Sequence, residues 1–270
     1  MIYPAQKPPF PSRINPYHPL SQGLVACWLM NEGGGNRIYD LSGRSGVGLF
    51  TSGPLWSPQK SGEIISFPGA GSINTASTTL DFSTNKSFTF SIWMTPNFNS
   101  ASNVGRAVIN FTGPGPAYNR SYLRWENSSL GFYFDIADNT GGSAWKSGTN
   151  ISFSTGTNHL LQFIHQSNNV GQFFFDGKNI ITATNGTKAI TSQNHPITIG
   201  FGSINSYYWN GLFSSVIIHN RALTAKEVWQ LYQNQYCFIQ ESHQHQYLPY
   251  GVRAGGVPPW LFMRQPGGAF

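Results

Sequence analysis

The sequence predicts an all-β fold: an antiparallel sandwich of short strands, with one short helix near its C-terminal end. Three observations predict it. Charged residues make up only 10% of the 270 residues, so Asn, Ser, Thr, Gln and Gly must cover the surface, which suits strands and loops better than surface helices. Apolar and polar residues alternate in several segments, which is the period of a strand. Turn-forming residues separate these segments.

The first predicted strand lies in the segment GLVACWLMNEGGG, which begins at Gly23. Its residues point alternately to opposite faces, and both faces are apolar. The glycines that follow let the chain turn, because they adopt positive φ without steric cost. We expect Val25, Cys27 and Leu29 on one face, and Ala26, Trp28 and Met30 on the other.

Residues 86–96, KSFTFSIWMTP, show the clearest alternation. A period of two over this length predicts a strand with a single buried face, packed on the core of the sandwich. The buried face is expected to carry Phe88, Phe90, Ile92 and Met94, and the other face Thr89, Ser91, Trp93 and Thr95.

Two hairpins are predicted from their turn residues. In residues 172–183, Asp176-Gly177 separates two apolar runs, which indicates a type I′ turn because both of its central residues need positive φ. Residues 122–136 form the second hairpin, around the polar stretch that runs from Asn127 to Gly131. Further strands are predicted over residues 160–166, 196–201 and 211–220.

One helix is predicted after these strands. Thr224 and Glu227 form a capping box, in which the Thr hydroxyl accepts from the N3 amide and the Glu carboxylate accepts from the cap amide. Val228, Leu231 and Tyr232 then give an apolar stripe at i, i+3 and i+4. We expect a helix of ~10 residues that packs on the edge of the sandwich.

The chain divides into three parts: a proline-rich N-terminal arm over residues 1–22, a globular body over 23–236, and a Gly/Pro/aromatic C-terminal arm over 237–270. It shows no apolar core of a signal peptide and no apolar stretch near 18 residues, so we expect neither a secretion signal nor membrane insertion. Cys27 and Cys237 are too few for a disulfide framework, and we favour two buried thiols over a bond.

Several function classes fit the sequence poorly. The net charge is +6, but no run of Lys or Arg occurs, so nucleic acid is not an expected partner. The glycines at 33–35 are not followed by the Lys-Ser/Thr of a P-loop. No two acids have the spacing of a glycosidase pair on one strand, although acids on different strands leave that alternative open. His243 and His245 lack the further ligands that zinc needs. We therefore expect a protein that is not an enzyme.

Five segments, in order, resemble laminin G-like, concanavalin A-like jelly-roll domains. They are the opening GLVACWLMNEGGGNRIYDLSG, the strand SIWMTP, the hairpin FFFDGKNIITAT, the strand ITIGFG, and the closing segment WNGLFSSVIIHNRALTAKEVWQLY. The resemblance covers residues 23–236 and implies two antiparallel sheets in a jelly roll. It also implies a binding or structural module, since members of the family mostly have such roles and some hold calcium or bind glycans.

The resemblance makes Glu32 and Asp40 candidate calcium ligands. Relatives with a structural calcium often carry an acid on the strand where this chain has Ser214 and Ser215. Calcium requires six to eight oxygen ligands with carboxylates among them, so the missing acid counts against the site. We favour the alternative that Asp40 caps the turn over residues 41–43, with no cofactor bound.

The two arms resemble the flanks of laminin G-like proteins encoded in bacteriophage-type genomes, which are virion components. This resemblance implies a structural or decoration protein of a virion, assembled in the host cytoplasm. Its partners would be other virion subunits, including copies of itself, held through the arms. Aromatic and apolar side chains are typical interface anchors. The candidates in the C-terminal arm are Tyr250, Trp260, Leu261 and Phe262.

Aromatic residues in polar loop stretches are the candidate ligand contacts. Exposed rings stack on sugars or anchor protein interfaces, whereas the alternative is that they fold back on the sandwich. Cell-surface glycans are thus a second candidate partner. The alternative function is a carbohydrate-binding adhesion module, with a glycan hydrolase third. The candidate contact residues are Tyr118, Trp145, Tyr207, Tyr208 and Trp209.

Overall fold

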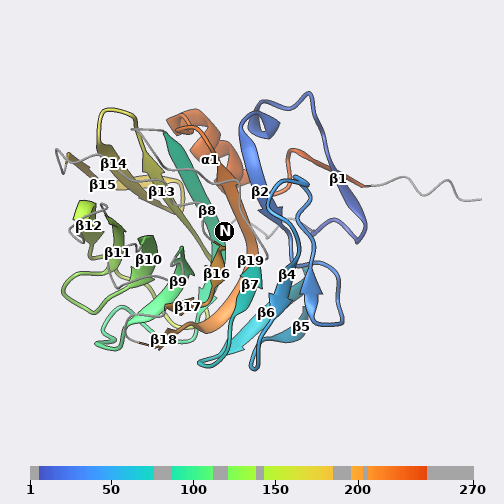
Figure 1. Cartoon of the computed structure of the whole chain (residues 1–270), viewed down its shortest axis with the longest axis horizontal. Helices are drawn as coiled ribbons and strands as arrows, with labels where there is room; N and C mark the ends of the chain where they lie inside the picture. Colours follow the sequence, from blue (N-terminus) through green and yellow to red (C-terminus); the bar gives the residue numbers. More distant parts are fainter. Residues whose placement is uncertain are drawn as a thin grey trace, which may run out of the picture.

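The computed structural model describes residues 6–75, 87–111, 121–137, 143–184, 196–202 and 206–241. It confirms the predicted fold class, because two antiparallel sheets pack face to face as a jelly-roll sandwich (Figure 1). We call these sheets the front sheet and the back sheet. In spatial order, the front sheet contains β12 (Ser143–Thr149), β11 (Phe132–Ala137), β10 (Ser121–Trp125), β9 (Arg106–Asn110), β16 (Thr198–Ile199), β7 (Ile73–Thr75), β4 (Gly48–Phe50) and β3 (Arg37–Ile38).

The back sheet is built around the long strand β19 (Asn210–His219). This strand pairs with β8 (Phe88–Pro96) along most of its length, and with β2 (Leu24–Trp28) and β6 (Gly62–Pro68) on its other side. In spatial order, the back sheet contains β15 (Lys178–Thr184), β14 (Val170–Phe175), β13 (His159–His165), β8, β19, β6 and β5 (Leu55–Gln59), with β2 also paired to β19.

Among the described residues, four short strands lie outside the two sheets. β1 (Ser12–Ile14) pairs with β20 (Ile239–Glu241), so the first and the last described strands lie side by side. β17 (Phe201–Gly202) pairs with β18 (Tyr207–Tyr208), and both lie between β16 and β19 in sequence. The predicted strand at 196–201 is thus divided in two at Gly200, whose φ is 82°.

The space between the two sheets is an aromatic-rich core. Phe134 of the front sheet stacks on Phe163 of the back sheet, with ring centroids 3.9 Å apart. Trp125 and Phe90 are also fully buried in this core. Interiors pack as densely as organic crystals, so these rings fix how the sheets lie on each other.

The back sheet is buried on its outer face as well, which corrects the prediction of one buried face for residues 86–96. Thr89 and Ser91 are fully buried and Trp93 is 8% exposed. The helix α1 (Ala225–Gln233) and the 3-10 turn η1 (Pro19–Ser21) cover this face with a second apolar cluster. Trp93 stacks on Tyr232 of α1, with ring centroids 6.2 Å apart. Periodicity alone does not report this second layer.

The first strand follows its predicted faces except at one residue. Ala26 and Trp28 face the core between the sheets, and Cys27 faces the outer cluster, as predicted. Val25 joins the inner core instead, because it is the extra residue of a bulge in β2. Ile218 pairs with Ala26 and His219 with Leu24, so Val25 has no partner opposite it in β19 and the alternation of faces is interrupted there.

The predicted turns and the predicted helix cap are confirmed. Asp176 and Gly177 both have positive φ, at 52° and 76°. The hairpin at 122–136 is formed by β10 and β11. At the start of α1, the Thr224 hydroxyl accepts from the amide of Glu227, and the carboxylate of Glu227 accepts from the amide of Thr224.

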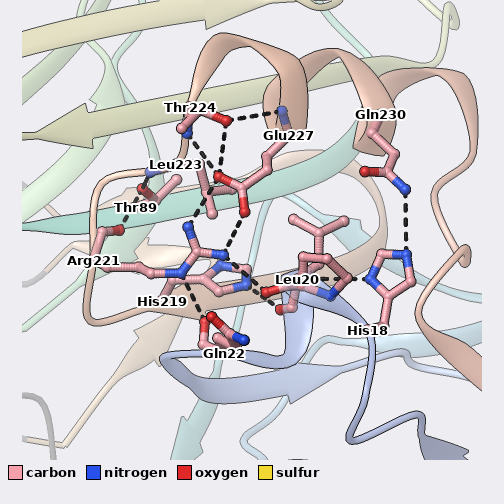
Figure 2. A network of polar contacts seen from close by, with 11 residues as sticks. His18, Leu20, Gln22, Thr89, His219, Arg221, Leu223, Thr224, Glu227 and Gln230 are labelled. Atoms are coloured by element: carbon pink, nitrogen blue, oxygen red, sulfur yellow. Dashed lines mark hydrogen bonds and ion pairs between the residues drawn. The ribbon is translucent and has the colours of Figure 1, made fainter.

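A polar network fastens the N-terminal segment to α1 (Figure 2). Arg221 lies at its centre and donates to both carboxylate oxygens of Glu227, at 2.9 and 2.6 Å. Arg221 also donates to the carbonyl oxygens of Gln22 and Pro19, at 2.8 and 3.1 Å. The buried ring of His219 donates from Nε2 to the carbonyl of Leu20, at 2.7 Å. Arg221 thus links α1 to Pro19 and Gln22, and His219 links β19 to Leu20. These partners lie 199 to 202 positions apart in the chain.

The described parts of the two arms are held by their own chain. β1 pairs with β20, so the N-terminal arm lies against the first residues of the C-terminal arm. Leu20 is fully buried in the outer cluster, and Phe238 packs in the same cluster. No neighbouring subunit is needed to hold these residues. The predicted arm anchors Tyr250, Trp260, Leu261 and Phe262 lie outside the described residues.

Both cysteines are free thiols, as favoured from the sequence, but only one of them is fully buried. Cys27 is buried and Cys237 is half-buried. Burial raises the pKa of Cys27 well above its ordinary value and that of Cys237 to about 11, so both are protonated at neutral pH. Among the described residues, no helix has the length and apolar character to cross a membrane.

Candidate functional site

A pocket of about 230 Å³ opens on the outer face of the back sheet, beyond the C-terminal end of α1. Strands β6, β8 and β19 contribute residues to it, and the segment that follows α1 forms another wall. The β5–β6 hairpin and the segment before β13 complete the rim. The lining residues are Gln59, Ser61, Ile64, Thr95, Gly156, Asn158, Leu212, Ser214, Gln235 and Tyr236.

None of the described residues that line this pocket carries a charge. Its polar groups are hydroxyls and carboxamides, and they lie beside the aliphatic side chains of Ile64 and Leu212. Thr95 donates from Oγ1 to Oδ1 of Asn158, at 3.3 Å. Carboxamides and hydroxyls both donate and accept hydrogen bonds. The pocket therefore suits a small neutral ligand with several hydroxyl groups and an apolar face.

The pocket wall after α1 consists of Gln235 and Tyr236, and polar contacts with β19 hold both residues in place. Gln235 is buried and donates from Nε2 to the hydroxyl of Ser215, at 2.8 Å. The hydroxyl of Tyr236 lies 3.4 Å from that of Ser214. Burial raises the pKa of Tyr236 far above its ordinary value, so this group stays a neutral hydroxyl. These contacts set the shape of the pocket before any ligand enters.

A second candidate surface lies on the outer face of the front sheet, centred on Arg124. The alternation that buries Leu123 and Trp125 in the core turns Arg124 outward. Its guanidinium carbon lies 4.2 Å from the ring centroid of Tyr122 and 5.9 Å from that of Tyr133. Both distances are within the ~6 Å range of cation–π attraction. Arg124 is also paired with the carboxylate of Glu126, so its charge is already balanced.

Tyr207, one of the predicted contact residues, joins this surface. Its ring centroid lies 5.2 Å from the guanidinium carbon of Arg124. A Cβ atom on Gly105 would lie only 2.1 Å from the Tyr207 ring, so the ring can lie there because residue 105 is glycine. Tyr208 is half-buried and packs against Phe201, with ring centroids 4.8 Å apart.

Trp209 is not a surface residue, which corrects its prediction as a contact. Its side chain is fully buried and stacks on Phe213, with ring centroids 4.8 Å apart. The loop interpretation failed because β18 ends at Tyr208 and the chain then returns to the core. Trp145 lies in β12, but its side chain is not among those described, and Tyr118 lies outside the described residues.

Asp40 has the turn role that we favoured over calcium. Its carboxylate accepts five hydrogen bonds. Oδ1 accepts from the amides of Cys27 and Ser42, at 2.7 and 2.9 Å. Oδ2 accepts from the hydroxyl of Ser42 and the amides of Arg44 and Ser45, at 2.6 to 2.9 Å. The carboxylate thereby ties this turn to β2.

Glu32, the other candidate calcium ligand, lies near one further acid, Glu63, since the charges of both act on Lys7. Oε1 of Glu32 accepts from the amide of Tyr39, at 2.7 Å. Burial raises its pKa, against the effect of that hydrogen bond. In the part of the chain that the structure describes, no three His, Cys, Asp or Glu side chains are grouped to hold a metal ion.

The sequence singled out Tyr207 of the Arg124 surface, but not Arg124 or its other ring partners, and it predicted no residue of the pocket as a ligand contact. For the Arg124 surface a signal exists, because the alternation in YLRW and FYFD places Tyr122, Arg124 and Tyr133 on the face opposite the core. For the pocket no sequence signal is apparent, since its lining comes from five separate segments.

Residues 67–229 match a laminin G-type family model, described as the concanavalin A-like lectin/glucanases superfamily. This range is more than half of the chain, and it contains all of β8, β13 and β19. No curated protein matches the sequence.

Solved structures of similar fold include two binding domains and one domain of an arabinanase. The binding domain of Paraclostridial Mosquitocidal Protein 1 has a TM-score of 0.63 and 18% identity, over 79% of this chain and 52% of that one. Domain 4 of AbnA, a GH43 extracellular arabinanase from Geobacillus stearothermophilus, was solved with arabinotriose. It has a TM-score of 0.60 and 18% identity, over 78% of this chain and 98% of that one. The binding domain of botulinum neurotoxin DC, solved with SialylT, has a TM-score of 0.61 and 12% identity, over 79% of this chain and 52% of that one.

At these identities the likeness concerns the fold alone. The chain spans about half the length of the mosquitocidal and neurotoxin domains, and nearly the whole of the arabinanase domain.

Proposed function

The chain belongs to the concanavalin A-like lectin/glucanases superfamily, and from that premise we propose that it is a non-enzymatic carbohydrate-binding module. Its sugar site is the neutral pocket on the back sheet. Two proteins of similar fold support the ligand class, since the arabinanase domain was solved with arabinotriose and the neurotoxin domain with SialylT.

The pocket lining is the observation that carries the proposal. A sugar ring presents hydroxyl groups around its edge and C–H groups on its faces. The carboxamides of Asn158 and Gln59 and the hydroxyl of Thr95 complement the hydroxyl groups. Leu212 and Ile64 complement the C–H face. The volume of about 230 Å³ is below the ~300–1,000 Å³ of sites for drug-sized ligands, so it suits one ring of a longer glycan.

The charge of the pocket selects between classes of sugar. An acidic sugar carries a carboxylate, and the strong partners of a carboxylate are Arg and Lys side chains. The described lining of the pocket contains neither Arg nor Lys. Arg124, on the other sheet, is already paired with Glu126. The ligand we propose is therefore a neutral glycan.

A screen on immobilised glycans tests this proposal with the full chain. We expect binding to neutral oligosaccharides, such as arabino-, xylo- and galacto-oligosaccharides, and not to glycans recognised through sialic acid. Binding that requires sialic acid would contradict the pocket as the site. Failure to bind any glycan on the screen would contradict the proposed function.

Virion assembly remains a second proposal, supported by the flanking segments rather than by the body. The pairing of β1 with β20 brings both arms to one edge of the molecule. The aromatic anchors Trp260 and Phe262 then follow Glu241 in sequence, beyond the described residues. A decoration protein would use this tail to bind other subunits, including its own copies, and would present its pocket to cell-surface glycans.

A further inference from the structure

Lys7 is a buried cation for which the body provides a fitted site. Its side chain is 4% exposed. The ammonium donates to the carbonyl oxygens of Met30, at 3.2 Å, and Ser214, at 2.8 Å, and to that of Glu63. An ammonium group has three N–H donors, and here each has a main-chain oxygen. These oxygens come from the segment just after β2, from β6 and from β19, which are far apart in sequence.

Two carboxylates add a negative field to this cage of oxygens. The charges of Glu32 and Glu63 both act on Lys7 and favour its charged form. In the described part of the chain, Oε2 of Glu32 is buried and accepts no hydrogen bond. A buried carboxylate oxygen without a donor is costly unless a positive charge lies nearby. The cage is therefore arranged for a cation rather than for a neutral group.

The segment that carries Lys7, residues 6–14, is named the strap here. Besides the ammonium, the strap contacts the body through buried Pro8, through Phe10, whose ring centroid lies 5.7 Å from that of Tyr39, and through Ile14, which packs on the outer cluster. It also makes polar contacts. The amide of Lys7 donates to the carbonyl of Ser61, at 2.8 Å. The carboxamide of Asn31 donates to the carbonyl of Pro8, at 2.8 Å. Burial lowers the pKa of Lys7 to about 7, so the charges of Glu32 and Glu63 offset only part of the cost of burying the ammonium.

We propose that the oxygen cage of Met30, Glu63 and Ser214, with Glu32 beside it, is a binding site for a primary ammonium ion, and that Lys7 is its tethered occupant, which fastens the strap to the body. The ligand class follows from the cage, since it offers three acceptors and a net negative charge. A free alkylammonium ion is then expected to bind when the side chain of Lys7 is removed.

Chemical rescue of Lys7→Ala tests this directly. The substitution removes three methylene groups and the ammonium, which n-propylammonium replaces. At ten times its dissociation constant, n-propylammonium chloride should raise the Tm of Lys7→Ala by about 3 °C and leave that of the wild type unchanged. Tetramethylammonium, which has no N–H donor, and 1-propanol, which has no charge, should have no such effect. Adding Glu32→Gln should weaken the rescue by n-propylammonium.

Equal stabilisation by all three compounds, or none in a folded Lys7→Ala protein, would overturn the proposal. If Lys7→Ala does not fold, Lys7→Met provides the test, because it keeps the aliphatic stem without the charge. The amides of the strap in Lys7→Met should exchange with deuterium at least about tenfold faster than in the wild type, which corresponds to 1.4 kcal/mol. Unchanged exchange of those amides would refute the role of the ammonium.

Discussion

His219 shows how a single buried residue gives this fold a dependence on pH. Burial lowers its pKa to about 4, and the nearby charge of Arg221 acts in the same direction. The ring is therefore neutral at pH 7 and donates only from Nε2, to the carbonyl of Leu20. Between pH 6.5 and pH 4 the unfolded chain binds a proton at this residue and the folded chain does not. Stability is thus lost as the pH falls through this window.

We predict that the free energy of unfolding falls by up to about 3 kcal/mol between pH 6.5 and pH 4 through His219 alone. His219→Gln keeps a donor near Leu20 but does not titrate, so its stability should vary less over the same range. Urea denaturation of both proteins at several pH values measures the difference. Parallel curves for the two proteins would contradict a buried neutral imidazole.

Neighbouring residues in the segment 207–209 show the limit of sequence reasoning at this scale. Tyr207 reaches the Arg124 surface, whereas Trp209, two positions later, is fully buried. The three aromatic residues looked alike as a loop cluster. What separates them is the place where β18 ends, which depends on pairing with β17 and not on local propensity.

At the scale of elements, the helix cap was predicted in full and can be tested in isolation. The Thr224 hydroxyl accepts from the amide of Glu227, at 3.3 Å. We expect Thr224→Ala to cost about 1 kcal/mol, or about 2–4 °C in Tm. Lys226→Ala, at an exposed position of the same helix, is the matched control and should have little effect. Equal shifts of Tm in the two variants would contradict a stabilising cap.

The long strands, both hairpins and α1 were predictable because each has a local signal: alternation, turn residues or a cap. The burial of both faces of β8 was not, because its outer face is covered by α1 and η1, which are distant in sequence. The pocket was unpredictable for the same reason. Its residues include Gln59, Thr95 and Tyr236, which only the completed fold brings together.

At the scale of the whole molecule, the proposed assembly role predicts a separation of functions. Truncation after Glu241 leaves every described element in place. We expect the shortened protein to keep its Tm and its glycan binding, and to lose self-association or incorporation into particles. Light scattering of the full and shortened chains, together with particle reconstitution, measures this. Unchanged assembly after truncation would contradict a role for Trp260 and its neighbours.

The two candidate surfaces lie on opposite sheets, so one set of variants separates them. The most direct test of glycan binding at the pocket is isothermal titration with the neutral oligosaccharide that binds best in the screen. We predict that Leu212→Trp, which fills the pocket, abolishes the heat of binding, and that Asn158→Ala weakens affinity at least about fivefold, or 1 kcal/mol. Tyr133→Ala, on the Arg124 surface, should bind as the wild type does. Full affinity in a folded Leu212→Trp protein, or loss of binding in Tyr133→Ala alone, would contradict the pocket as the sugar site.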